Sequence, residues 1–282
     1  MPSSRILQQQ EARRRFAEAV GAEETRLDLA RAALLIAAED EPGLHVEPYL
    51  ERLDEWGQEA RELVAQTADG VTALNEYLFD TLGFNGNRKN YQDPRNSFLN
   101  RVIERRVGLP ITLSVVYLEV AWRTGLPAEG VGMPGHFIVR VGESWGGEAA
   151  LVDPFHRRVL SVEDCQDKLD ELFNGRLVLH PLHLRAVTKK EILTRMLANL
   201  KGVYAQSKLH ARAIAAGERI LLINPDAHGE LRDCAYLLAA MSRWDEAVQT
   251  GEKYLKAAPA APDFDEIREL VKQWQRRRAA LN

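Results

Sequence analysis

Residues 96–155 constrain the fold of this chain most, because the hydrophobic period changes within this stretch. Between positions 110 and 121 apolar residues occupy almost every helical position, which indicates a buried helix that begins at Pro110. From Phe137 to Val141 apolar residues alternate, and a second short apolar run ends at Asp153. The glycine-rich residues 142–147 between the two runs predict a hairpin connection. We therefore expect a small antiparallel sheet packed on a buried helix.

The flanking segments have helical periodicity. Apolar residues at three- and four-residue spacings predict helices over residues 12–38, 49–64 and 71–82 before this stretch, and over residues 162–173 after it. A further helix should carry Leu99 inward and end before Gly108, with Asn96 or Ser97 as its N-cap. The first eighty residues are thus predicted to form a helical layer.

A repeat is visible in the last third of the chain. Five positions recur at an offset of 34 residues: Ala213 with Ala247, Gly217 with Gly251, Glu218 with Glu252, Leu221 with Leu255, and Pro225 with Pro259. This is the period of tetratricopeptide repeats, in which small residues let paired helices pack closely. We expect a helical repeat domain over residues 188–282, after a first domain over residues 1–187.

Composition narrows the class of protein. The 282 residues carry 37 basic and 41 acidic side chains, and the resulting net charge of −4 argues against a nucleic-acid partner. No apolar run is long enough for a membrane helix, and the first twenty residues lack the apolar segment of an export signal. Two cysteines in unlike contexts, Cys165 and Cys234, support neither a disulfide framework nor a zinc site. We expect a cytoplasmic protein.

His136 and Asp153 are the strongest candidates for chemistry. On adjacent strands, the carboxylate could hold the imidazole in one tautomer. A nucleophile is missing, because no cysteine precedes the buried helix; Thr112 and Ser114 are weaker substitutes for a thiol. A metal site from His136, Asp153 and His156 would lack a fixed helical spacing. We therefore expect neither a metal nor another cofactor.

Several motifs resemble the core of the transglutaminase-like superfamily, a cysteine-protease-like fold. They are Gly108-Leu109-Pro110, Gly135-His136-Phe137 and Val152-Asp153-Pro154. On this resemblance His136 takes the histidine position and Asp153 the aspartate position, whereas the cysteine position falls at or next to Pro110. Residues 96–100, 105–111 and 133–137 are most similar to the bacterial SirB-type family, which joins such a core to C-terminal tetratricopeptide repeats. The thiol is typically absent there too, so the resemblance implies a fold descended from acyl-transfer enzymes without implying their activity.

Polar residues surround the entry to the buried helix and form a second group of candidates. Asn96, Asn100, Arg105, Arg106 and Pro110 are candidate binding residues there. The two arginines are either surface charge or ligands for an anionic group.

The two cysteines are poor candidates for a reactive thiol. Cys165 lies among acidic residues, which favour its thiol over the thiolate. Cys234 occupies an apolar repeat position and is expected to serve packing.

Together these patterns predict an α+β protein with three parts: a helical N-terminal layer, a transglutaminase-like core with a small antiparallel sheet, and an all-α repeat region resembling tetratricopeptide repeats. We expect a pseudoenzyme that acts as a scaffold and binds a protein or peptide partner through its repeats. A regulatory role is part of this expectation. The alternative is a hydrolase or acyltransferase that uses His136 and Asp153 with a nucleophile other than cysteine, namely Ser114, Thr112 or water.

Overall fold

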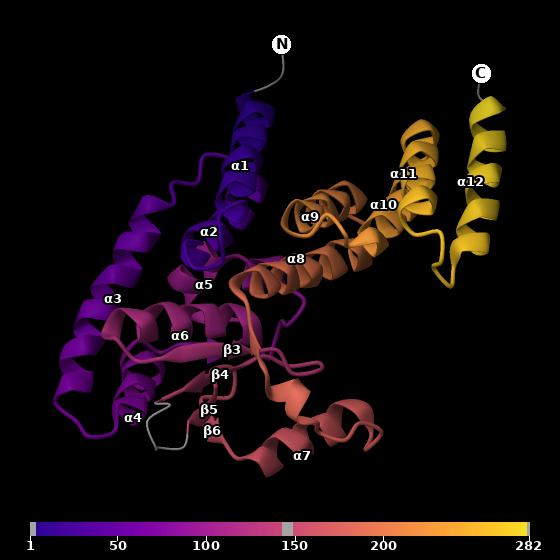
Figure 1. Ribbon diagram of the computed structural model, residues 1–282. Coiled ribbons are helices and arrows are strands. Elements are labelled where there is room, and N and C mark those ends of the chain that lie inside the picture. Colours follow the sequence, from indigo (N-terminus) through magenta and orange to yellow (C-terminus); the bar gives the residue numbers. More distant parts are fainter. Residues whose placement is uncertain (1–3, 143–148, 281–282) are drawn as a thin grey trace. The chain divides into compact units, whose positions relative to one another are not determined.

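The computed structural model describes residues 4–142 and 149–280, which form two compact units, Met1–Met196 and Leu197–Asn282 (Figure 1). Helix α8 (Lys189–Gln206) runs through the border between them. The domain boundary expected after residue 187 stays a prediction. Each unit is described by itself below.

Helices form the N-terminal layer of the first unit, as predicted. They are α1 (Ser4–Val20), α2 (Leu29–Asp40), α3 (Glu47–Ala65), α4 (Gly70–Asn75) and a π-helix, η1 (Glu76–Thr81). Two boundaries differ from the prediction. The helix expected over residues 12–38 is broken into α1 and α2, and Asp28 caps the second by accepting from the N–H of Arg31. The helix expected over residues 71–82 changes from α to π geometry at Glu76.

A five-stranded antiparallel sheet forms the core of the first unit, with strand order β6-β5-β4-β3-β7. The strands are β3 (Ala128–Val131), β4 (Ile138–Val141), β5 (Ala150–Asp153), β6 (Arg158–Leu160) and β7 (Ala186–Val187). The predicted hairpin pair is present, since β4 and β5 pair with Val139 opposite Val152. Of the predicted connection over residues 142–147, residues 143–147 lie outside the described part of the chain.

Helix α6 (Pro110–Thr124) packs on α3 and on strands β3 and β4 (Figure 1). Its residues from Pro110 to Ala121 are all buried, so the prediction of a buried central helix is confirmed. Glu119 is the buried charge on this helix. Its carboxylate accepts from the backbone N–H of Ala30 at 2.9 Å, which joins α2 to α6, and it also pairs with Arg123 on the same helix.

Shorter elements connect the layer to the sheet. They are β1 (Asn85–Gly86) parallel to β2 (Val107–Gly108), the 3₁₀ helices η2 (Pro94–Ser97) and η3 (Pro181–Leu184), and helices α5 (Leu99–Arg105) and α7 (Val162–Phe173). The expectation that Asn96 or Ser97 caps α5 is wrong: Phe98 holds the N-cap position, and Asn96 and Ser97 belong to η2.

The second unit is helical, with α9 (His210–Ile223), α10 (His228–Ala240), α11 (Trp244–Ala257) and α12 (Phe264–Ala279) after the end of α8. Successive helices pack on one another from α9 to α12. A Cβ atom at Gly251 would lie 2.6 Å from a methyl carbon of Val271, and one at Gly217 would lie 3.0 Å from Sγ of Cys234. The close helix packing predicted from the small repeat residues is therefore confirmed.

Candidate functional site

The sheet brings the two predicted chemical residues together. His136 lies just before β4, and Asp153 is the last residue of the neighbouring strand β5. Nε2 of His136 is 2.9 Å from Oδ2 of Asp153. The contact expected from the hairpin pattern is therefore present.

Asp153 has more partners than the sequence indicated. Its Oδ1 accepts from the backbone N–H groups of Phe155 and His156 at 3.0 and 3.1 Å. Its Oδ2 lies 2.7 Å from Nδ1 of His156 and 3.2 Å from Nζ of Lys168, in addition to His136. Nζ of Lys168 is also 3.1 Å from Nδ1 of His156. We call His136, Asp153, His156 and Lys168 the Asp153 cluster.

Most of the Asp153 cluster is buried. The side chains of Asp153, His136 and Lys168 are 0%, 7% and 8% exposed, whereas that of His156 is 29% exposed. Because Lys168 neutralises Asp153, the buried carboxylate is compensated without a protonated histidine.

The electrostatics follow from burial and these contacts. Burial works to raise the pKa of Asp153, but hydrogen bonds from His136 and His156 outweigh it and hold the pKa well below its usual range. Burial lowers the pKa of His136 and outweighs the opposing effect of Asp153. His136 is therefore a neutral imidazole at neutral pH, with its Nε2–H donated to Asp153.

Neither predicted hydroxyl nucleophile is hydrogen-bonded to His136. Pro110 is buried at the first position of α6. The hydroxyl of Thr112 donates to the carbonyl of Asn96 at 2.8 Å and accepts from the N–H of Leu109 at 2.9 Å, so it caps the helix. Oγ of Ser114 is buried without a hydrogen-bond partner among the described residues. A hydroxyl activated by the imidazole is therefore not formed here.

Cys165 provides no alternative thiol. It is buried on α7, and burial together with the charge of Asp164 raises its pKa to about 11. This raised pKa agrees with the expectation that Cys165 stays in its thiol form.

The candidate binding residues near α6 serve the loops and helices around them. Nδ2 of Asn96 donates to the carbonyls of Asn90 and Tyr91, at 2.8 and 3.2 Å. Nδ2 of Asn100 donates to Glu41 at 2.9 Å.

The two candidate arginines have different surroundings. The guanidinium of Arg105 lies 3.5 Å from the Asp93 carboxylate. That of Arg106 stacks over Trp56, 4.1 Å from the ring centroid. Neither arginine joins the Asp153 cluster.

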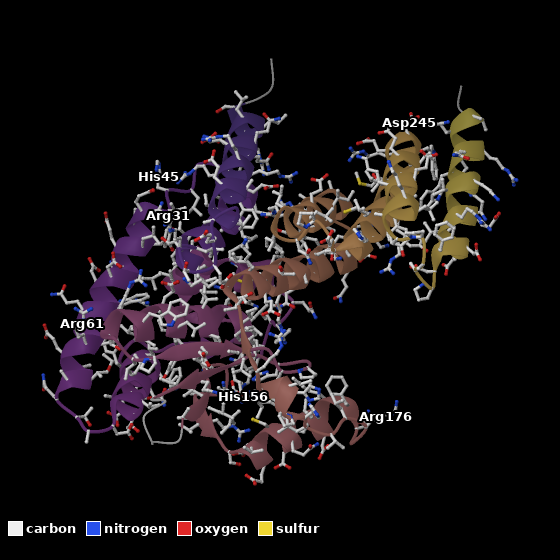
Figure 2. The ribbon with its side chains drawn as sticks, in the orientation of Figure 1. Arg31, His45, Arg61, His156, Arg176 and Asp245 are labelled. Atoms are coloured by element: carbon white, nitrogen blue, oxygen red, sulfur yellow. The ribbon has the colours of Figure 1, made fainter. Side chains whose placement is uncertain are left out.

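A groove of about 340 Å³ lies beside the Asp153 cluster, lined by Thr72, Asn75, Glu76, Phe79, Asp80, His156 and Arg157. His156, which is labelled in Figure 2, is the cluster residue that reaches it. Its Nδ1 faces Asp153, and its Nε2 has no hydrogen-bond partner in the described part of the chain. The π-helix η1 supplies Glu76, Phe79 and Asp80 to this groove, and π-helical turns are frequent at functional sites.

Sequence reasoning missed Lys168. A weak signal existed, because Lys168 shares a face of α7 with the apolar residues Cys165 and Leu169, and all three are buried. His136, Asp153 and His156 are also the residues that could hold a metal, since their donor atoms all lie within 4.8 Å of one another. In the described residues no helix is long and apolar enough to span a membrane.

Comparison with known proteins gives two family matches along the chain. Residues 47–198 match the family model of a transglutaminase-like superfamily, and residues 200–272 match a tetratricopeptide repeat. A UPF0162 protein of Xylella fastidiosa is 34% identical over 86% of this chain and 88% of its own length. A UPF0162 protein of Vibrio cholerae is 26% identical over 71% of this chain and 73% of its own. The mouse F-box only protein 21 is 36% identical over 49% of this chain and 22% of its own length.

Proposed function

Because the chain belongs to the transglutaminase-like superfamily but has proline where its resemblance to that core places cysteine, we propose that it is a non-catalytic, SirB-type member that binds a protein or peptide partner. The core serves as a scaffold, and the tetratricopeptide repeats carry the binding surface. The proposal places this work in the cytoplasm.

One observation carries the proposal: Asp153, the residue that would orient a catalytic histidine, is fully buried and contacted by five donor groups. These donors come from the residue His136 just before β4, the turn after β5, and α7. Because one carboxylate bonds to donors from three elements, we assign Asp153 the structural role of holding these elements together. With neither Thr112 nor Ser114 hydrogen-bonded to His136, the cluster lacks the second reactant of an acyl-transfer site.

The repeat unit supports the partner-binding half of the proposal. Tetratricopeptide repeats generally serve protein–protein interaction. Tyr236 on α10 is 37% exposed and is the aromatic among the exposed large hydrophobic residues of this unit's described part. Tyrosine is frequent among residues that dominate binding energy.

Affinity capture with the full chain as bait tests this proposal. A partner should be retained by a His136→Gln variant and lost with a Tyr236→Arg variant of unchanged melting temperature. The proposal fails if no protein is specifically captured, or if the partner is lost with His136→Gln and kept with Tyr236→Arg.

A second candidate, hydrolysis by activated water, is favoured by His156. Its Nδ1 lies 2.7 Å from Asp153 while the ring lines the groove, an arrangement suited to a general base. Nitrophenyl esters of short acids would test it. Turnover that disappears with His156→Gln or His136→Ala at unchanged melting temperature supports this candidate, and absence of turnover in the unmodified chain rejects it.

A further inference from the structure

The Asp153 cluster has the donor set of a metal site. Two imidazole nitrogens, Nε2 of His136 and Nδ1 of His156, approach the same carboxylate oxygen of Asp153 at 2.9 and 2.7 Å. Imidazole and carboxylate together suit Zn²⁺ and neighbouring divalent transition metals. A tetrahedral Zn²⁺ with bonds of about 2.0–2.2 Å holds its donor atoms about 3.3–3.6 Å apart. The observed separations are within a side-chain adjustment of that geometry.

A cation already occupies this position. Nζ of Lys168 lies 3.2 Å from Oδ2 of Asp153 and 3.1 Å from Nδ1 of His156, so the ammonium faces two of the three donors. Its side chain is 8% exposed, which keeps it from exchanging this contact for water. Lys168 thus supplies the positive charge that the buried carboxylate needs. It also repels a second cation and fills the space where one would bind.

We propose that the Lys168 ammonium takes the place that a divalent transition-metal ion would hold among the two histidines and the carboxylate of the Asp153 cluster. Removing this ammonium opens the site to Zn²⁺ or Co²⁺, with His136, Asp153 and His156 as ligands. The unmodified chain binds these ions weakly at this position, because the metal must displace Lys168. This inference is independent of partner binding by the repeats.

Metal binding by a Lys168→Ala variant tests the proposal. With any histidine tag removed, equilibrium dialysis against ZnCl₂ should find one tightly bound Zn²⁺ per chain in this variant. Zn²⁺ at about 100 times its dissociation constant should raise the melting temperature of the variant by roughly 5–10 °C. CoCl₂ should give the visible bands of a tetrahedral nitrogen and oxygen site, without the charge-transfer band of a thiolate, since the Cys165 thiol stays protonated.

The matched control is the double variant Lys168→Ala/His156→Gln, which keeps the vacated space but removes one ligand. It should lose the tight site, and the unmodified chain should show neither the Zn²⁺-dependent shift nor the cobalt bands. If Lys168→Ala does not fold without metal, Lys168→Ser, whose small side chain is polar, replaces it. The proposal is overturned if the folded variant binds no more Zn²⁺ than its double-variant control. It is also overturned if the unmodified chain binds Zn²⁺ equally tightly.

Discussion

Replacing Asp153 with alanine should destabilise the first unit strongly, because this carboxylate joins three elements of the fold. The substitution leaves the Lys168 ammonium, 8% exposed, without its counter-charge, and breaking a buried ion pair in this way costs about 3–5 kcal/mol. The N–H groups of Phe155 and His156 also lose their acceptor, at about 1 kcal/mol each. These losses overlap, because the same carboxylate is the partner in all of these contacts. We therefore expect a total of about 4 kcal/mol.

Differential scanning calorimetry of the full chain measures this effect. For a unit of this size, about 4 kcal/mol corresponds to a fall in melting temperature of roughly 8–16 °C. The matched control is Asp80→Ala. Asp80 is 67% exposed and pairs with Arg157 in the groove beside the Asp153 cluster. Exposed pairs contribute less than about 1 kcal/mol, so this variant should melt within about 4 °C of the unmodified chain. Equal shifts for the two variants would refute the structural role of Asp153.

Three further outcomes follow from the geometry. The unmodified chain should lose stability as the pH falls from 7 to 4. Because folding lowers the pKa of His136, the stability contributed by this residue is complete above the unfolded pKa of about 6.5 and is lost below it. Urea denaturation midpoints measured across this pH range test the direction of the change. Gly251→Ala should destabilise the repeat unit by about 1–3 kcal/mol, since the new methyl would lie 2.6 Å from a side chain of α12, whereas Gly202→Ala on α8 has open space and should be neutral or stabilising in the same denaturation assay. Neither Cys165 nor Cys234 should react with a thiol reagent at pH 8 until the chain is unfolded, because burial raises their pKa values to about 11 and about 12; rapid labelling of the native protein would contradict this.

The sequence predicted those elements in which the spacing of apolar residues matches the pattern of buried residues in the fold. Alternation over residues 137–141 and the apolar run ending at Asp153 gave the β4–β5 pair, and with it the contact between His136 and Asp153. The buried helix α6 followed from its continuous apolar surface, and the 34-residue offset gave the repeat region. In each, the pattern is local and directly reflects which face is buried.

What the sequence did not give depends on contacts between distant residues. Lys168 looks like any lysine on an amphipathic helix, and its burial is visible only once α7 lies against the turn that carries His156. From the sequence, Thr112 was a candidate nucleophile, because the acceptor of its hydroxyl, the Asn96 carbonyl, lies on another element and could not be foreseen. The π-helix at residues 76–81 differs from an α-helix by one residue in hydrogen-bond offset, which leaves no clear periodic signal.

Histidine side-chain NMR of the full chain, followed through a pH titration, tests the central claim most directly. If the Asp153 cluster is a closed structural network, the pKa of His136 lies below that of a free histidine, and its proton is on Nε2, hydrogen-bonded to Asp153. If His136 instead titrates at the value of a free histidine and exchanges its ring proton rapidly with water, the imidazole is open and mobile. That result would contradict the account of the core as a scaffold.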